Sequence, residues 1–305
     1  MPAVGTEHLD MNVLIIGATG YLGSAIDEAL DERGHRTFGV ARSAAARQRL
    51  AQRGTAIVEA DAARPQTLVA PMRDADAVVY AANITDADNW SVGANALRAI
   101  RKGLAGSEKT FVYISTAWVY GATGRVPAGE NFPLNPPLLV LRRLEHEHLT
   151  LDMTKVGIRS LVVRPGIVYG DGGGVPSMFV QSARERGAAT IVGDGTNHWA
   201  TIGLADLGSL VSLAVERGLP GRAYNAVNDD HPQVHRIAEA ASRGAGAGGA
   251  TKVVPQEVMG LFGDCLALDQ HVSAERAKTD LGWQPCGPTI IEEMERGSYI
   301  GASAA

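Results

Sequence analysis

The sequence predicts an α/β fold in which a doubly wound parallel sheet carries a smaller C-terminal lobe. Apolar strand runs alternate with helical segments through the first half of the chain, which is the pattern of parallel βαβ units. A glycine-rich loop directly follows the first strand run and opens the first helix. The length of 305 residues suits one sheet domain with an appended lobe rather than two large domains.

Each expected strand is a short run of aliphatic, β-branched or aromatic residues, as is typical of strands buried on both faces. Six of them are expected at residues 12–16, 36–41, 56–59, 77–80, 110–115 and 159–164, and the first helix at residues 25–32. A seventh strand from a later return of the chain would complete the sheet, with a ligand at its carboxyl edge.

After Gly170 the pattern changes to glycine-rich turns and a helical stretch at residues 206–216. This change predicts the domain limits. We expect a flexible tail at residues 1–10, the sheet domain at residues 11–170 with returns near 203–226, and a lobe that holds the substrate at residues 171–202 and 227–305.

The composition excludes several classes of protein. The net charge of -5 and the lack of a basic stripe argue against nucleic-acid binding. No apolar run approaches the roughly 18 residues of a membrane span, and residues 1–10 do not resemble a secretory signal. Cys265 and Cys286 show no metal-ligand spacing. We expect a cytoplasmic protein that binds a small molecule, with no membrane association, no disulfide and no metal.

The glycine loop, Gly17-Ala18-Thr19-Gly20-Tyr21-Leu22-Gly23, lies between a strand and a helix, which is the context that gives this motif its meaning. Gly17 permits the tight turn, Gly20 lets the backbone approach a pyrophosphate, and Gly23 allows close helix packing. The helix N-terminus supplies N–H groups and a positive dipole for the phosphates. The sequence therefore predicts a Rossmann domain that binds a dinucleotide through Gly17, Thr19, Gly20, Tyr21 and Leu22.

The end of the second expected strand indicates which dinucleotide is bound. An NAD site usually places an acid there to hold the ribose 2'-hydroxyl, but this stretch ends in Ala41-Arg42-Ser43. Arg42 can pair with a 2'-phosphate and Ser43 can hydrogen-bond to it. NADP(H) is therefore favoured over NAD(H). The alternative is that Arg42 is a solvated arginine at a strand end.

Further motifs follow one another in the order found in the extended short-chain dehydrogenase/reductases of the NAD-dependent epimerase/dehydratase superfamily, and the chain resembles this family over nearly its whole length. They are the glycine loop, Asp61, Ala81-Ala82-Asn83, residues 115–121, residues 164–170 and residues 281–285. The resemblance implies cofactor contacts from Asp61 and Ala62 to the adenine, from Ala81, Ala82 and Asn83 to the ribose and nicotinamide side, and from Pro165, Gly166 and Val168 to the carboxamide. It also implies a homodimer formed through helices that flank the sheet.

The resemblance places Thr116, beside Ser115, at the position of the family's catalytic Ser or Thr. A hydroxyl there can hydrogen-bond a substrate carbonyl as negative charge grows on its oxygen. The alternative is that this hydroxyl only bonds the backbone at a strand end.

The family's catalytic tyrosine and lysine are missing. Matching Glu147 to the family's later glutamate puts Leu139 at the tyrosine and Arg143 at the lysine. The loss does not depend on this alignment, because residues 121–168 contain no Tyr and residues 110–154 contain no Lys. Arg143 stays protonated and is a poor proton relay, so it either stabilises negative charge or the cofactor ribose, or is a solvated helix residue.

Reduction of a ketone still requires a proton on the new alkoxide oxygen. Three sources remain open: water, a side chain among Ser115, Thr116, Tyr120 and His146, or a phenol or enol of the substrate itself. His146 and His148 point to different faces of a helix, so we expect two surface histidines rather than a metal pair.

The leading hypothesis is an NADPH-dependent reductase of a ketone on a bulky aromatic metabolite, since leucine in place of the catalytic tyrosine suits a flat apolar substrate. In overall similarity the chain resembles the tailoring ketoreductases of angucyclinone antibiotic pathways, of the simocyclinone type. One alternative is a non-catalytic NADP(H)-sensing regulator of the NmrA type, which also lacks the acid/base pair. The other is a nucleotide-sugar epimerase or dehydratase, which would need the missing tyrosine.

Overall fold

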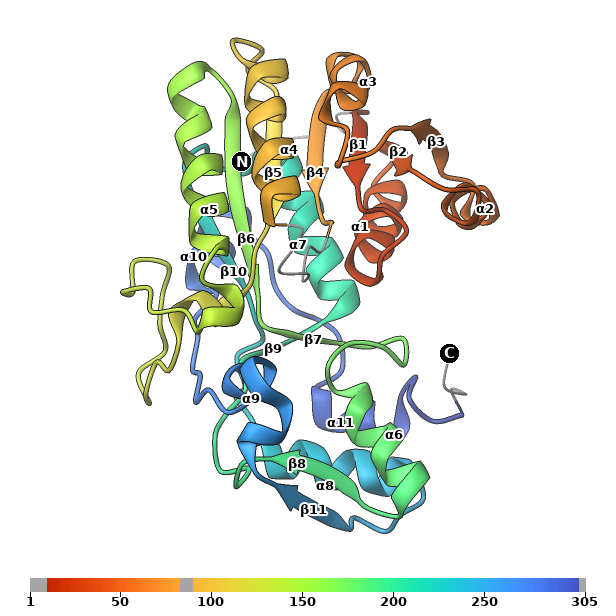
Figure 1. Ribbon diagram of the computed structural model, residues 1–305, viewed down its shortest axis with the longest axis vertical. Helices are drawn as coiled ribbons and strands as arrows, with labels where there is room; N and C mark the ends of the chain where they lie inside the picture. The colour runs from red at the N-terminus through yellow and green to blue at the C-terminus, as the bar shows by residue number, and fades with distance from the viewer. Residues whose placement is uncertain (1–9, 83–89, 302–305) are drawn as a thin grey trace, which may run out of the picture. The chain divides into compact units, whose positions relative to one another are not determined.

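The computed structural model describes residues 10–82 and 90–301, so most of the expected tail at residues 1–10 lies outside the described residues. Its centre is a seven-stranded parallel sheet (Figure 1). The strands are β1 (Asn12–Ile16), β2 (Arg36–Ala41), β3 (Ala56–Glu59), β4 (Ala77–Tyr80), β5 (Thr110–Ile114), β6 (Arg159–Pro165) and β10 (Ala223–Ala226). The expected doubly wound fold is therefore confirmed, with strand limits within one residue of those predicted.

The strand order is β10-β6-β5-β4-β1-β2-β3, so the direction of winding reverses between β1 and β4. Leu14 of β1 lies opposite Phe38 of β2 and Val78 of β4, and residues 13–16 are almost fully buried. Both faces of the central strands are covered. These strands therefore have no polar side, and their sequences are continuous apolar runs. A reversal of this kind opens a crevice at the carboxyl ends of the strands, where ligands of such sheets bind.

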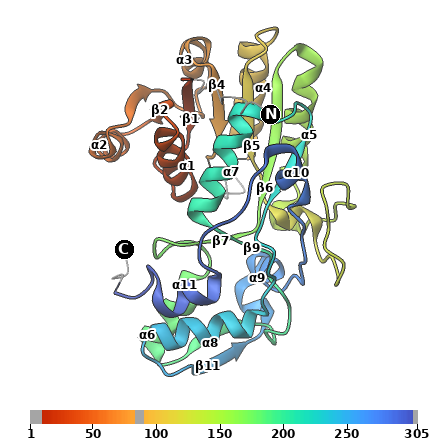
Figure 2. The same ribbon diagram turned by 180° about the vertical axis from the view of Figure 1, so that it is seen from behind.

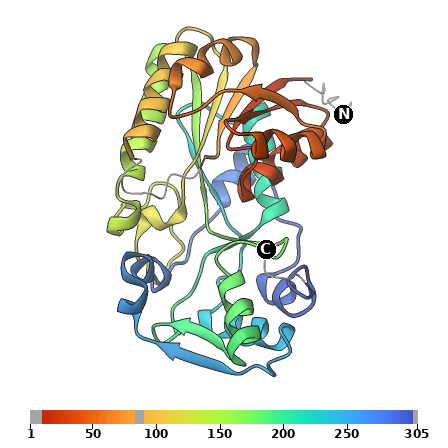
Figure 3. The same cartoon turned by 45° about the vertical axis from the view of Figure 1, so that its right-hand side comes forward.

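Helices cover both faces of the sheet, as Figure 3 shows for α1 and α4. The helices that connect the strands are α1 (Tyr21–Glu32), α2 (Ala44–Arg53), α3 (Val69–Asp74), α4 (Trp90–Leu104), α5 (Arg143–Leu151) and α7 (Leu204–Arg217), with 3-10 turns η1 (Pro65–Leu68), η3 (Ala117–Tyr120), η4 (Leu138–Val140) and η5 (Asp152–Val156). The prediction of the first helix at residues 25–32 was four residues short, because the helix begins inside the glycine loop with Gly20 as its N-cap.

The chain divides into two compact units. The first contains the described residues up to Tyr113 together with His148–Leu161 and Val211–Arg222. The second contains Ile114–Glu147, Val162–Leu210 and the described residues from Ala223 onward. Within residues 10–82 and 90–301, no helix combines the length and the apolarity that crossing a membrane requires.

The second unit contains the smaller lobe, in which two short parallel pairs of strands lie beside helices (Figure 2). Besides the large sheet and the elements named above, the second unit contains β7 (Ile167–Tyr169), α6 (Ser177–Arg186), β8 (Ala189–Val192), β9 (Thr201–Gly203), α8 (Val234–Gly244), β11 (Thr251–Val254), η6 (Gln256–Met259), α9 (Gly260–Leu266), α11 (Ile290–Arg296) and α10 (Glu275–Leu281), which lies beside β10. Phe179 and Trp199 stack at 5.6 Å between ring centroids within the core of this lobe. Asp206 fixes the loop after Trp283, because its carboxylate accepts hydrogen bonds from the backbone N–H groups of Cys286 and Gly287.

Candidate functional site

The glycine loop of the first unit forms a tight turn that no larger residue would fit. Gly17 has a φ of +98°, and a Cβ added to it would lie 2.6 Å from the backbone nitrogen of Ala82. A Cβ on Gly23 would lie 2.0 Å from the carbonyl oxygen of Gly17. Both positions therefore require glycine. At Gly17 the reasons are the positive φ and the close neighbouring backbone, and at Gly23 the reason is the close neighbouring backbone alone. The loop between β1 and α1 is thereby held against the end of β4, at the point where the sheet reverses.

The N-terminus of α1 opens directly from this loop. Gly20 is the N-cap residue and has no side chain, so no side-chain hydrogen bond caps the first turn. The first N–H groups of a helix lack partners within the helix, and the helix dipole adds partial positive charge there. Thr19, Tyr21 and Leu22 lie on either side of this cap. The arrangement suits a phosphate group, as the sequence predicts.

Arg42 and Ser43 are exposed at the carboxyl end of β2. Ser43 is the N-cap of α2, and its hydroxyl oxygen accepts a hydrogen bond from the N–H of Ala46 at 3.2 Å. Among the described residues no carboxylate lies within ion-pair distance of Arg42, whereas Arg47 pairs with Glu59 at 3.1 Å. The guanidinium of Arg42 is thus the cation that this strand end offers to a ligand.

The other predicted contacts in the first unit lie on loops after β3 and β4. Asp61 accepts a hydrogen bond from the N–H of Ala63 at 3.0 Å and lies 3.5 Å from Arg64, so its carboxylate organises its own turn. Ala62 is half-buried beside it. Ala81 donates its N–H to the carbonyl oxygen of Ile16 at 2.9 Å, which ties the end of β4 to the end of β1.

Asn83, also predicted to contact the cofactor, lies outside the described residues.

In the second unit, the predicted carboxamide contacts Pro165, Gly166 and Val168 lie at the end of β6 and in β7. A Cβ on Gly166 would lie 2.4 Å from the carbonyl oxygen of Ala200, so this position also requires glycine. The N–H of Gly166 donates to the carbonyl oxygen of Ala226 at 3.0 Å. Gly166 lies between β6 and β7, and the absence of a side chain lets its backbone lie close to the backbone of Ala200.

Thr116 and Ser115 follow β5 directly, but their hydroxyl groups have different surroundings. The Thr116 hydroxyl oxygen accepts a hydrogen bond from the N–H of Trp118 at 3.3 Å, and the residue is half-buried. Accepting this bond leaves its own hydrogen available for donation to a ligand. Ser115 is buried, and its hydroxyl donates to Glu147 at 2.5 Å. Thr116 is the better placed of the two for contact with a substrate.

Glu147 and Arg164 form a buried ion pair beneath this segment. The exposed fractions of their side chains are 1% and 4%, and the closest nitrogen–oxygen distance is 2.6 Å. Arg164 also donates to the hydroxyl of Tyr120 at 2.9 Å, and Tyr120 donates to the side-chain oxygen of Asn225 at 2.8 Å. Burial raises the pKa of Tyr120 above its ordinary value, although Arg164 opposes this. Sequence reasoning used Glu147 only to align the chain and missed this partnership.

Leu139 and Arg143, which the resemblance aligns with the family's tyrosine and lysine, do not lie in one continuous helix. Leu139 lies in the 3-10 turn η4, and α5 begins only at Arg143. The guanidinium of Arg143 donates to the carbonyl oxygen of Ile114, at the end of β5, at 3.3 Å. Arg143 is half-buried and holds a backbone group close to the Thr116 segment, and its role toward a negative charge or the cofactor ribose stays a prediction.

The histidines of α5 correct a second expectation. His148 is exposed as predicted, but His146 is buried, with an exposed fraction of 4%. The buried residues of α5, His146, Glu147 and Thr150, lie on one face of the helix, and His148 lies on another. Tyr120 is fully buried as well, so neither of these two candidate proton donors faces solvent.

Apolar side chains are exposed on either side of Leu139. Leu138 and Leu141 flank Leu139 in and after η4, with exposed fractions of 69% and 45%. The helix α9 packs against η4 and exposes Leu261 to 47%. Large apolar groups left in solvent near a site are typical of surfaces that contact an apolar ligand.

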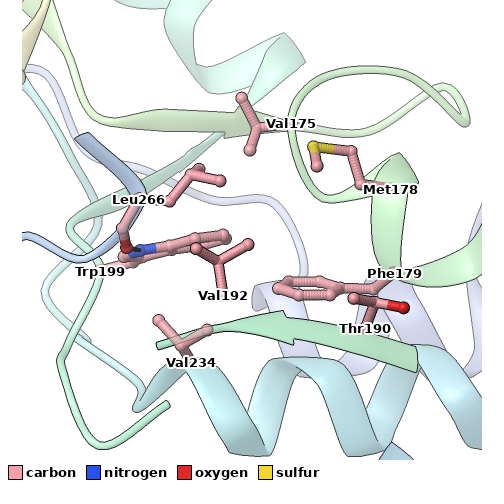
Figure 4. Close-up of a pocket in the computed structure, with 8 residues that line it drawn as sticks. All are labelled: Val175, Met178, Phe179, Thr190, Val192, Trp199, Val234 and Leu266. Atoms are coloured by element: carbon pink, nitrogen blue, oxygen red, sulfur yellow. Dashed lines mark hydrogen bonds between the residues drawn. The ribbon is translucent and has the colours of Figure 1, made fainter. Parts of the chain in front are cut away.

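A small void inside the lobe does not serve as a ligand site. Figure 4 shows the side chains that surround it, which include Val192, Trp199 and Leu266. Its volume of about 10 Å³ is at most that of one water molecule. The indole N–H of Trp199 donates to the carbonyl oxygen of Leu266 at 2.9 Å. Trp199 is therefore a core residue of the lobe.

The family of the protein follows from comparison with known proteins. Residues 13–226 match the NAD dependent epimerase/dehydratase family. The chain therefore belongs to this family, whose fold and glycine-loop site agree with the geometry described above.

Relatives span nearly the whole chain. An uncharacterized protein of Schizosaccharomyces pombe is 26% identical over 95% of this chain and 100% of its own, and one of Saccharomyces cerevisiae is 28% identical over 95% and 99%. A 2-alkyl-3-oxoalkanoate reductase of Stenotrophomonas maltophilia is 25% identical over 70% of this chain and 68% of its own.

Solved structures share the fold. A Thermus thermophilus UDP-glucose 4-epimerase in complex with NAD has a TM-score of 0.77 at 20% identity, covering 96% of this chain and 100% of its own. RMD from Pseudomonas aeruginosa complexed with NADPH has a TM-score of 0.71 at 20% identity, covering 94% and 98%. The neighbours include complexes with either nicotinamide dinucleotide, so the fold alone does not select between the two.

The buried ion pair generates a prediction about stability. Replacing Glu147 with alanine leaves the Arg164 guanidinium buried without its counter-ion, which costs about 3–5 kcal/mol of unfolding free energy. The matched control is Glu145→Ala two residues earlier, whose carboxylate is 63% exposed and lies 3.8 Å from Arg142. That change is expected to cost about 0.5 kcal/mol or less. Urea unfolding of both variants tests this, and equal losses of stability contradict it.

Proposed function

We propose that the protein is an NADPH-dependent ketoreductase that acts on a bulky aromatic ketone. The observation that carries the proposal is the combination of a glycine loop that fits a dinucleotide with two exposed leucines, Leu138 and Leu141, close to Leu139 at the aligned position of the family's tyrosine. More specifically, we propose that the substrate is a polyketide of the angucyclinone class. We further propose that the protein works in the cytoplasm as a homodimer and binds neither nucleic acid nor membrane.

The residues present fit a nicotinamide dinucleotide. Any side chain at Gly17 would fill the space beside the glycine loop. No side chain caps the N-terminus of α1, so its first N–H groups are open to a phosphate. Arg42 would bind a 2'-phosphate at the end of β2 and Ser43 would hydrogen-bond to it. Asp61, Ala62, Ala81, Ala82 and Asn83 in one unit and Pro165, Gly166 and Val168 in the other are the proposed remaining contacts. Bound NADPH supplies the hydride that reduces the carbonyl carbon.

The exposed leucines support an apolar substrate. Leu138 and Leu141 would lose contact with water against a flat aromatic ring system, which is favourable by about 25 cal/mol for each Å² of apolar surface covered. A nucleotide sugar, by contrast, carries a diphosphate that needs cations or helix N-termini. The exposed side chains of η4 and α9 named above offer it none.

The chemistry requires one hydride at carbon and one proton at oxygen, so that the ketone becomes a secondary alcohol. Thr116 is proposed to donate a hydrogen bond to the carbonyl oxygen and so stabilise the charge that develops there. A threonine hydroxyl is a weak acid that donates a hydrogen bond and keeps its proton, and Ser115 already donates to Glu147. We propose that a phenol next to the ketone in the substrate supplies the proton, so the missing tyrosine is not required.

The 2-alkyl-3-oxoalkanoate reductase among the relatives supports reduction rather than epimerisation, because its name describes reduction of an oxo group. Leu139 also supports the regulator hypothesis, in which the dinucleotide is bound but not used. The experiment below distinguishes reduction from both alternatives, the NADP(H)-sensing regulator and the nucleotide-sugar epimerase or dehydratase.

The decisive experiment compares pairs of aromatic ketones that differ in one methyl group. We expect the protein to oxidise NADPH with ketones that carry an adjacent free phenol, and to lose most of this activity with their phenol methyl ethers. Product analysis with deuterated NADPH must find deuterium on the carbinol carbon. Binding of NADPH without turnover of any ketone would favour the regulator, and conversion of a UDP-sugar with retained NAD would favour the epimerase.

The choice of dinucleotide is tested at Arg42. We expect Arg42→Ala to raise the Kd for NADPH about tenfold or more, since a hydrogen bond to a charged group contributes about 1.5–3 kcal/mol. The Kd for NADH should stay unchanged. Arg47→Ala is the control, because Arg47 already pairs with Glu59. Fluorescence titration measures both constants, and an equal loss for the two dinucleotides would refute the assignment.

The role of Thr116 is tested by two substitutions. Thr116→Val keeps the shape and removes the hydroxyl, and we expect kcat to fall about a hundredfold with little change in KM. Thr116→Ser restores the hydroxyl and should recover most of the activity. If valine and serine behave alike, or if only stability changes, the hydroxyl has no part in the reaction.

A further inference from the structure

A second group of titratable side chains lies in the second unit, apart from the residues used above. His198, Asp269 and His271 each offer one ligand atom within 4.8 Å of the other two. The Nδ1 atom of His198 and a carboxylate oxygen of Asp269 are 2.9 Å apart, and the same oxygen accepts from the backbone N–H of His198 at 2.7 Å. The imidazole rings of His198 and His271 have centroids 4.6 Å apart. All three residues are partly exposed, so an ion can reach them from solvent.

An independent observation at His271 points to a ligand. Its Nδ1 atom is buried, yet no group among the described residues hydrogen-bonds to it. Burying a polar nitrogen without a partner costs about 1–3 kcal/mol, and such groups in folded proteins usually have a partner. A bound ion would satisfy this nitrogen.

The backbone holds His271 in place before any ion binds. The hydroxyl of Thr123 accepts from the backbone N–H of His271 at 2.7 Å and donates to its carbonyl oxygen at 2.9 Å. The side-chain nitrogen of Gln270 donates to two carbonyl oxygens in residues 117–121, at 2.9 and 2.8 Å. Because these contacts fix the segment, little conformational freedom is lost when ligands are recruited to an ion.

We propose that His198, Asp269 and His271 bind one divalent transition-metal ion. Two imidazoles and one carboxylate are a donor set that zinc accepts, with a further position left for water. Calcium and magnesium prefer oxygen donors and are disfavoured by the two nitrogens. A divalent ion would take the place of the proton between His198 and Asp269.

The neighbouring His231 is not a ligand in this proposal. Its Nε2 atom lies 2.8 Å from the carbonyl oxygen of Val272 and 3.0 Å from that residue's backbone nitrogen, so it is engaged by the backbone. Its ring packs against His271 at 5.2 Å between centroids. His231 therefore closes one side of the cluster without adding a donor.

The test is metal binding by tag-free protein that has been treated with a chelator. Calorimetric titration with Zn²⁺ should show one ion per chain, Co²⁺ should give visible ligand-field absorption, and Ca²⁺ and Mg²⁺ should not compete. His271→Gln and Asp269→Asn should each weaken Zn²⁺ binding about tenfold or more and abolish the rise in Tm that Zn²⁺ causes. His148→Gln, which removes an exposed histidine outside the cluster, should leave both unchanged.

The wild-type titration decides the matter even if a variant fails to fold. Absence of stoichiometric Zn²⁺ binding overturns the proposal, and so does binding that is unaffected by both substitutions in the cluster. The inference does not depend on ketone reduction, since its readouts are calorimetry, absorption and thermal stability.

Discussion

The buried ion pair between Glu147 and Arg164 is the constraint on which the second unit depends. A charge removed from water is costly unless a counter-ion and hydrogen bonds replace the lost hydration. Glu147 meets this need for Arg164, Ser115 donates to Glu147, and Tyr120 accepts from Arg164 and donates in turn to Asn225. The pair therefore fixes the ends of β5, β6 and β10 in one arrangement. Thr116 follows directly from this fixed point, so its backbone cannot shift without breaking a buried bond.

The same network limits which side chains could supply a proton in the proposed reduction. Ser115 gives its hydrogen to Glu147, and Tyr120 is buried with its hydroxyl hydrogen given to Asn225. Arg143 is bound to a backbone carbonyl and stays protonated. Ser115, Tyr120 and Arg143 thus use their hydrogen atoms in bonds that stabilise the fold near Thr116. A substrate that brings its own phenol is the simplest way in which the proposed reduction could proceed.

The sequence was most informative where local pattern and burial coincide. The central strands are covered on both faces, so their apolar runs gave limits within one residue of those in the structure. It was least informative near residues 138–148, where a helix with two surface histidines was expected. The chain instead forms a 3-10 turn, and α5 starts at Arg143 with His146 buried. Short turns of this kind are set by contacts with distant segments, which a local pattern does not contain.

The sequence by itself determined the doubly wound sheet and the glycine loop, because each depends on residue types in neighbouring positions. It also shows that residues 121–168 contain no Tyr and residues 110–154 no Lys. Only the tertiary structure decided that Glu147 pairs with Arg164 and that His198 meets Asp269 and His271. Cysteine spacing and the pair of histidines on α5 predicted no metal site, since ligand spacing reveals only donors that are close in the chain. Asp269 lies 71 residues after His198, and folding alone brings their side chains to 2.9 Å.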